Sequence, residues 1–154
     1  MATMVSNLEL IRRVPLFSML TSVQAESVSA AVVKRRFKRG EDIVQQGKKT
    51  DALTIILTGR ARVITTDTRG REVILATLQP GAYVGEMSLI EDGPRSADAI
   101  AETRVVALRL SGEAFERLRM RHPALAAKLM HNISLYLSGR LRGLTTELAD
   151  WLGR

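Results

Sequence analysis

Hydrophobic residues in the middle of the chain come in short runs that are separated by glycines at nearly even intervals. After Gly47, and leaving aside Gly85, the glycines fall at positions 59, 70, 81 and 93, which are spacings of 12, 11, 11 and 12 residues. The β-prone runs among them are Ala52–Thr58, Ala61–Thr66, Glu72–Leu78, Ala97–Ala101 and Val105–Leu110. Short strands at this interval, punctuated by turn residues, predict a mainly β fold, a small sandwich or barrel of about eight strands.

Both ends of the chain carry helical periodicity instead. Near the N-terminus, Thr21 or Ser22 is the expected N-cap of an amphipathic stretch that continues to Val33. Beyond the β-prone runs, Ser111 is the expected N-cap of a short helix, and Pro123 suits the first turn of a long one. The pattern predicts a single domain over 1–154, with helices at about 7–33, a β unit at 34–110 and helices at 111–152.

The long C-terminal helix carries a stripe of apolar residues. The stripe consists of Leu125, Leu129 and Ile133, followed at alternating spacings of four and three by Leu137, Leu141, Leu144, Leu148 and Trp151. Two interpretations stay open: the helix lays this face on its own β core, or the stripe is the seam of a homodimer. Gly139 and Gly143 lower helix propensity, so they predict a bend or a close approach of another backbone.

Composition narrows the range of functions. The 154 residues include 23 Lys and Arg against 16 Asp and Glu, a net charge of +7 that attracts anionic ligands. The chain has no cysteine, which excludes disulfides and thiolate metal sites, and aromatic residues make up only 4%. With two histidines and no recognisable catalytic motif, we expect neither an enzyme nor a metal site. No signal peptide or membrane span is visible, so we expect a cytoplasmic protein.

Residues 85–97 read GEMSLIEDGPRSA and carry candidate binding chemistry. Gly85 lets a ligand approach the backbone, and N–H groups at the start of a helical turn can hold an anion. The Glu86 carboxylate can accept hydrogen bonds from hydroxyls, while the Arg95 guanidinium can fork onto two phosphate oxygens. Together with further polar groups, these two side chains could bind one phosphate and one sugar. The further groups are the Met87 and Ser88 amides, the Ser96 hydroxyl and the Ala97 amide. A structural Glu86–Arg95 salt bridge across a turn is the alternative.

The segment resembles the phosphate-binding cassette of the cyclic nucleotide-binding domain family, F-G-E-x-A-L-x-x-x-x-P-R-x-A. Here it reads V-G-E-M-S-L and then P-R-S-A, with Val84 in place of the aromatic residue and Ser88 in place of a small apolar one. Further similar stretches are Val14–Phe17, Lys38–Glu41 with Gln46–Gly47, Leu57–Val63 and Leu78–Glu86. The resemblance covers about residues 10–150. It implies an antiparallel, jelly-roll-like β-roll with N-terminal helices and a long C-terminal helix.

The resemblance also implies roles for single residues. Glu86 would accept the ribose 2′-hydroxyl and Arg95 would pair with the cyclic phosphate, while Leu75 would line the base pocket. The other ligand-binding candidates are Gly85, Met87, Ser88, Ser96 and Ala97, and weaker base-contact candidates are Val73, Val84, Thr145 and Thr146. For Leu75 and Val73 the alternative is an ordinary core position. For the two threonines it is hydrogen bonding to their own helix backbone.

These observations together predict a non-enzymatic sensor that binds cyclic AMP as first choice or cyclic GMP as second. Ligand binding would shift the C-terminal helix, and no cofactor is expected beside the nucleotide. The chain resembles the sensor half of catabolite-activator regulators and ends at Arg154 without a helix-turn-helix, so we expect no DNA reading by this chain alone. Expected partners are a second copy or an effector domain. The alternative function is a protein-interaction module that has lost its ligand.

Overall fold

Three short helical segments open the described part of the protein. The computed structural model describes residues 7–44, 52–86 and 97–153. The segments are α1 (Asn7–Arg13), the 3-10 helix η1 (Pro15–Phe17) and α2 (Ser22–Ala31). Thr21 is the N-cap of α2: its side chain accepts a hydrogen bond from the Gln24 amide, and the Gln24 side chain accepts one from the Thr21 amide. The helix ends two residues before the expected Val33, because Val33 begins the first strand.

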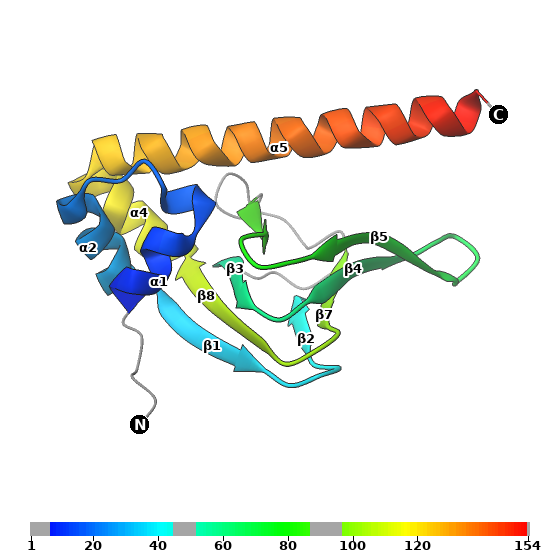
Figure 1. Ribbon diagram of the computed structural model, residues 1–154, viewed down its shortest axis with the longest axis horizontal. Helices are drawn as coiled ribbons and strands as arrows, with labels where there is room; N and C mark the ends of the chain where they lie inside the picture. The colour runs from blue at the N-terminus through cyan, green and yellow to red at the C-terminus, as the bar shows by residue number, and fades with distance from the viewer. Residues whose placement is uncertain (1–6, 45–51, 87–96, 154) are drawn as a thin grey trace.

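The strands of the described residues form two four-stranded sheets. They are β1 (Val33–Phe37), β2 (Asp42–Val44), β3 (Ala52–Thr58), β4 (Ala61–Thr66), β5 (Glu72–Leu78), β6 (Tyr83–Val84), β7 (Asp98–Ala101) and β8 (Val105–Ser111). The first sheet has the order β1-β8-β3-β6 and the second β2-β7-β4-β5, with every pair antiparallel (Figure 1). The mainly β, antiparallel β-roll predicted from the sequence is therefore confirmed.

Most of the predicted strands have the expected bounds. β3, β4 and β5 agree with the glycine-punctuated runs to the residue, and β7 and β8 differ from them by one residue at one end. The sequence pattern does not indicate β1, β2 or β6 individually. In β1 only Phe37 is buried, so this strand at the border of the first sheet has no hydrophobic alternation to reveal it.

Glycines make the turns between these strands possible. Gly59, Gly70 and Gly81 have φ angles of 88°, 80° and 94°, a conformation that other residues rarely adopt. At Gly59 a side chain is also excluded by space, because a Cβ would lie 2.0 Å from the carbonyl oxygen of Arg104. The even glycine spacing thus reflects backbone geometry at the ends of strands.

Two hydrophobic clusters lie on opposite faces of the first sheet. The helix-side cluster joins the sheet to the helices and includes Leu53, Ile55, Leu108, Leu110, Phe115, Leu129 and Ile133. The inter-sheet cluster fills the roll and includes Phe37, Ile56, Val63, Leu78, Ala99, Ala101 and Ala107. Neighbouring residues of one strand, such as Ile55 and Ile56, point into different clusters because side chains alternate along a strand.

Two helices follow β8 and complete the helical layer. Ser111 caps α4 (Gly112–Arg121) as expected, its hydroxyl oxygen accepting a hydrogen bond from the Ala114 amide at 3.1 Å. α5 (Pro123–Leu152) has 30 residues and extends well past the helical layer, on the side of the β4–β5 hairpin (Figure 1). Gly139 and Gly143 do not interrupt it, and a Cβ at either position would meet nothing within 4 Å. Within the described residues of this chain, no other backbone approaches these two glycines closely.

The apolar stripe of α5 divides into two halves. The first half, Leu125, Leu129 and Ile133, is buried in the helix-side cluster, and Leu137 packs against it. The second half, which we call the distal stripe, is exposed and consists of Leu141, Leu144, Leu148 and Trp151. Packing on the protein's own core therefore explains the first half of the pattern and not the second.

Candidate functional site

The segment after β6 places one carboxylate in the interior. Gly85 has a φ angle of 91°, so the backbone turns here in a conformation that favours glycine. Glu86 follows directly, and its side chain is only 8% exposed. A buried carboxylate needs partners, because desolvation is costly for a group that can be charged. The hydrogen-bond partners of this carboxylate therefore indicate which groups can bind at this site.

Glu86 contacts the long C-terminal helix. Its Oε1 accepts a hydrogen bond from Nη1 of Arg140 at 3.3 Å, and the two groups form an ion pair. Its Oε2 is buried and has no hydrogen-bond partner among the described residues. One oxygen of this carboxylate thus contacts α5, and the other has no donor among the residues that the structure describes.

Two stacked tyrosines support the arginine of this ion pair. The rings of Tyr83, from β6, and Tyr136, from α5, stack with centroids 4.1 Å apart at 28°. The guanidinium carbon of Arg140 lies 5.5 Å from the Tyr136 centroid, within the range of a cation–π interaction. Burial raises the pKa of the Tyr83 hydroxyl well above its usual value, so this hydroxyl stays protonated. Residues from β6 and α5 therefore form one continuous contact chain that ends at Glu86.

The described base-pocket candidates occupy different environments. Leu75 and Val73 lie on β5 and are 53% and 40% exposed, so the alternative that they are ordinary core residues is wrong. Val84 is half-buried and packs against the inter-sheet cluster, as does Ala97, whose amide is a candidate phosphate contact. The apolar candidates on β5 are thus accessible to a ligand, whereas the side chains of Val84 and Ala97 contribute to the apolar core of the roll.

Thr145 and Thr146 are exposed on the distal part of α5. Their hydroxyls donate hydrogen bonds to the carbonyl oxygens of Leu141 at 2.9 Å and Arg142 at 3.1 Å. Each bond spans four residues within the helix, as in the alternative considered for helical threonines. A base contact would require these hydroxyls to exchange an internal partner for the ligand.

Four of the predicted site residues lie outside the described residues. They are Met87, Ser88, Arg95 and Ser96. Of the predicted charge pair, only Glu86 is therefore placed, and the partner found for it is Arg140.

Sequence reasoning missed Arg140, together with Tyr136 and Tyr83. Arg140 is one of many basic residues, and its acidic partner is 54 positions earlier in the chain. A local signal does exist, because Tyr136 and Arg140 are four residues apart and so share one face of a helix. That spacing could have singled out this arginine without revealing its partner.

Two other kinds of site find no support in the described part of the chain. No group of three or more His, Cys, Asp or Glu side chains there could hold a metal ion. Within 7–44, 52–86 and 97–153, no helix is both long and apolar enough to cross a membrane.

Comparison with known proteins agrees with the observed fold. A family model for the cyclic nucleotide-binding domain matches residues 34–122. The chain is 35% identical over 134 residues to a cyclic AMP receptor protein of Thermus thermophilus, covering 87% of this chain and 60% of that protein. It is also 35% identical over 112 residues to a cGMP-dependent protein kinase of Eimeria tenella, covering 73% of this chain and 11% of the kinase.

A solved structure shares the architecture. The crystal structure of a cyclic nucleotide-binding domain from Methylobacillus flagellatus superimposes with a TM-score of 0.84 at 26% identity, covering 94% of this chain and 82% of that one. The fold is thus that of a ligand-binding regulatory β-roll. The chain belongs to the cyclic nucleotide-binding domain family, as its resemblance to the cassette indicated.

Proposed function

We propose that this chain is a non-enzymatic cyclic nucleotide sensor, with Glu86 as the acceptor for the ribose 2′-hydroxyl. The observation that carries the proposal is the buried Oε2 of Glu86, which has no partner among the described residues. A ligand hydroxyl would satisfy this oxygen, since a desolvated acceptor without a hydrogen bond costs free energy. Isothermal titration calorimetry with cyclic AMP, cyclic GMP and acyclic 5′-AMP tests the proposal. If the chain bound neither cyclic AMP nor cyclic GMP, the proposal would be overturned.

The remaining contacts follow the family's pattern. Arg95 would pair with the cyclic phosphate, with further contacts from Gly85, Met87, Ser88, Ser96 and Ala97. Leu75 is the proposed base contact on β5, and its exposure leaves it accessible. The weaker base contacts are Val73, Val84, Thr145 and Thr146.

Cyclic AMP is the first choice of ligand and cyclic GMP the second. The relative from Thermus thermophilus that is named for cyclic AMP covers more of this chain than the kinase that is named for cyclic GMP. A serine at position 96, next to the phosphate-binding arginine, leaves recognition of guanine open. Calorimetry with both nucleotides on one sample ranks them directly.

Binding would be coupled to the position of α5 through Arg140. The ligand hydroxyl and the arginine would share one carboxylate, so a change at Oε2 alters the hydrogen bond at Oε1. Two events that bias one equilibrium are linked reciprocally, so nucleotide binding and helix position would favour each other. The Tyr83–Tyr136 stack would transmit the same change to β6.

Replacing Arg140 by glutamine is expected to remove most of this coupling. The chain has no cysteine, so spin labels can be attached at Thr66→Cys on β4 and Asp150→Cys on α5, two exposed positions outside the distal stripe. The distance between the two labels is measured by electron paramagnetic resonance in the presence of excess unlabelled protein, and it should change when cyclic AMP is added. Arg140→Gln should reduce that change by more than half. Arg142→Gln is the control. An equal change in both variants would contradict the role of Arg140.

The distal stripe of α5 would join two copies of the chain. It presents four large apolar side chains at coiled-coil spacing, all of them exposed. Such a surface on a helix end is typical of an interface with a second helix. An effector domain is the other partner that this surface would fit.

Leu148→Glu is expected to convert a dimer into a monomer. A charged side chain in the seam would have to be desolvated beside its symmetry copy, which is unfavourable. Light scattering coupled to gel filtration measures the mass. Leu135→Glu is the control, because Leu135 is equally exposed on α5 but lies outside the stripe. If the wild type has the mass of a single chain, an effector domain becomes the favoured partner of the distal stripe.

The alternative function is an interaction module on the same fold that no longer binds nucleotide. It would leave the ion pair between buried Glu86 and partly exposed Arg140 as a purely structural link. Calorimetry separates the two functions, since only the sensor binds a cyclic nucleotide. We further propose that the sensor works in the cytoplasm, where cyclic nucleotides act as signals.

A further inference from the structure

The first sheet carries an apolar face that becomes basic at one end. Side chains of alternate residues share a face, so Phe37 and Arg35 of β1 point the same way, as do Ala107 and Arg109 of β8. Phe37 and Ala107 are buried in the inter-sheet cluster. Arg35 is exposed and Arg109 half-buried. The same face therefore presents two guanidinium groups where it is no longer covered by the apolar cluster.

The strand register brings these two arginines together. Val33 pairs with Arg109, and Arg35 pairs with Ala107, so the arginines are diagonal neighbours across β1 and β8. Burial and the charge of Arg35 lower the pKa of Arg109. Within the described residues, none of the ion pairs involves either arginine. Two neighbouring cations without an acidic partner repel each other, and an anion between them would relieve that repulsion.

A cavity lies beside the two arginines. It has a volume of about 250 Å³ and is lined by Ala31, Val33, Arg35, Ala52, Arg109 and Ser111. Ser111 is the N-cap of α4, so the positive end of the helix dipole lies at this cavity as well. Its hydroxyl oxygen already accepts from the Ala114 amide, which leaves its own O–H free to donate. Two guanidinium groups, a hydroxyl donor and a helix N-terminus therefore border one space.

We propose that this cavity is a second ligand site, which binds the phosphate group of a small phosphorylated molecule or free phosphate. Each planar guanidinium can donate two parallel hydrogen bonds, and the pair matches the double charge of a phosphate. The site shares no residue with the candidate nucleotide site and does not depend on the proposed function. Its walls on the other side, Ala31, Val33 and Ala52, are apolar and would face the uncharged part of a phosphorylated ligand.

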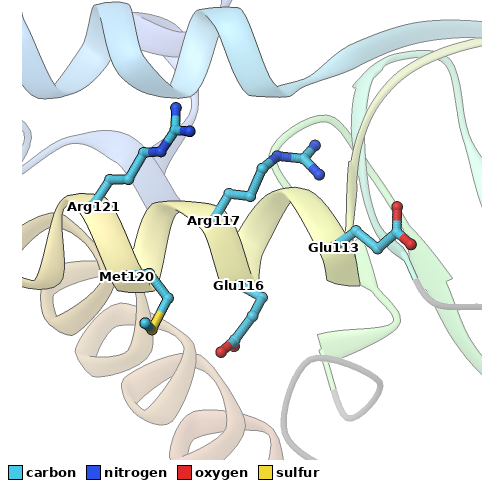
Figure 2. A pocket seen from close by; sticks show the side chains of 5 residues that line it. All are labelled: Glu113, Glu116, Arg117, Met120 and Arg121. Atoms are coloured by element: carbon cyan, nitrogen blue, oxygen red, sulfur yellow. The ribbon is translucent and has the colours of Figure 1, made fainter.

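The arginines of α4 provide a matched comparison. Figure 2 shows Arg117 and Arg121 extending to the same side of α4, with Glu113 and Glu116 on the same helix. Here, too, two arginines border a cavity, but carboxylates border it as well. A phosphate should avoid this mixed surface, so Arg117→Ala with Arg121→Ala controls for nonspecific attraction to positive charge.

Nuclear magnetic resonance titration with inorganic phosphate at constant ionic strength tests the proposal. Amide signals of residues 33–35 and 109–112 should shift together in ¹⁵N-labelled protein. Arg109→Gln and, separately, Arg35→Ala should weaken the apparent affinity at least tenfold, because each removes a charge-assisted pair of hydrogen bonds. Arg109→Lys keeps the charge and loses the fork, so it should fall between wild type and Arg109→Gln. The α4 double variant should bind like the wild type.

Two further measurements keep the outcomes distinct. Phosphate could also occupy the cassette, so the titration is repeated in Arg95→Ala, where shifts at 33–35 and 109–112 should persist. Phosphate should raise the melting temperature of the wild type and not that of Arg35→Ala, whose exposed position makes it the safer variant for folding. Unchanged affinity in Arg35→Ala and Arg109→Gln, or shifts spread equally over α4, would overturn the proposal. The same titration is repeated with a phosphorylated sugar. If the sugar phosphate binds more tightly than inorganic phosphate, the natural ligand is a small phosphorylated molecule rather than free phosphate.

Discussion

Arg95→Ala is expected to lower the affinity for cyclic AMP at least tenfold. By the family's cassette pattern, this arginine would pair with the cyclic phosphate; it lies outside the described residues. A hydrogen bond to a charged group contributes about 1.5–3 kcal/mol, which corresponds to roughly 10- to 150-fold in the dissociation constant. Calorimetry on both proteins under the same salt conditions gives the ratio.

Two control variants distinguish the specific loss of the Arg95 guanidinium from a general loss of positive charge. Arg121→Ala removes an exposed arginine from α4 and should leave the affinity for cyclic AMP unchanged. Arg95→Lys keeps the charge but loses the bidentate geometry, so its affinity should be intermediate. If Arg95→Ala bound as tightly as the wild type, the cassette assignment of this residue would be wrong.

Leu129→Ala is expected to reduce the free energy of unfolding by about 2–5 kcal/mol, because it opens a cavity in a close-packed cluster. Leu129 is 1% exposed and lies in the helix-side cluster, where α5 packs against the rest of the fold. For a chain of this size the melting temperature should fall by roughly 2–4 °C per kcal/mol. Urea and thermal unfolding followed by circular dichroism measure both quantities.

Leu135 offers the matched control on the same helix. It is exposed, so Leu135→Ala should change the free energy of unfolding by no more than about 0.5 kcal/mol. A similar loss in both variants would mean that helix propensity rather than cluster packing determines the stability of α5. That result would contradict the division of the stripe into a buried and an exposed half.

The β-roll was predictable because its turns carry a chemical signature. Glycines at positive φ follow β3 and lie in the turns after β4 and β5, so each interval between them contains one strand together with its turn. β1 has no such signature. Its sequence, VKRRF, has one buried residue, and its place at the border of the sheet is determined by pairing with β8. Local pattern therefore predicts strands with glycine turns and misses a charged border strand.

The site was predictable only in part, for a related reason. Glu86 was identifiable because the cassette is contiguous in sequence. Arg140 was not, since its contact with Glu86 depends on the path of α5 over the roll, which no local pattern records. The apolar stripe of α5 shows the same limit: spacing alone does not distinguish Leu129, which is buried, from Leu144, which is exposed.

The two sheets also end in strands of very different character. β1 borders the first sheet with Lys34, Arg35 and Arg36 in sequence, and such charges discourage a foreign strand from adding to the border. β5 borders the second sheet with Val73, Ile74 and Leu75, all exposed. If this protein forms fibrils at high concentration, strand addition should therefore begin at β5, and whatever covers that edge would act as protection against aggregation.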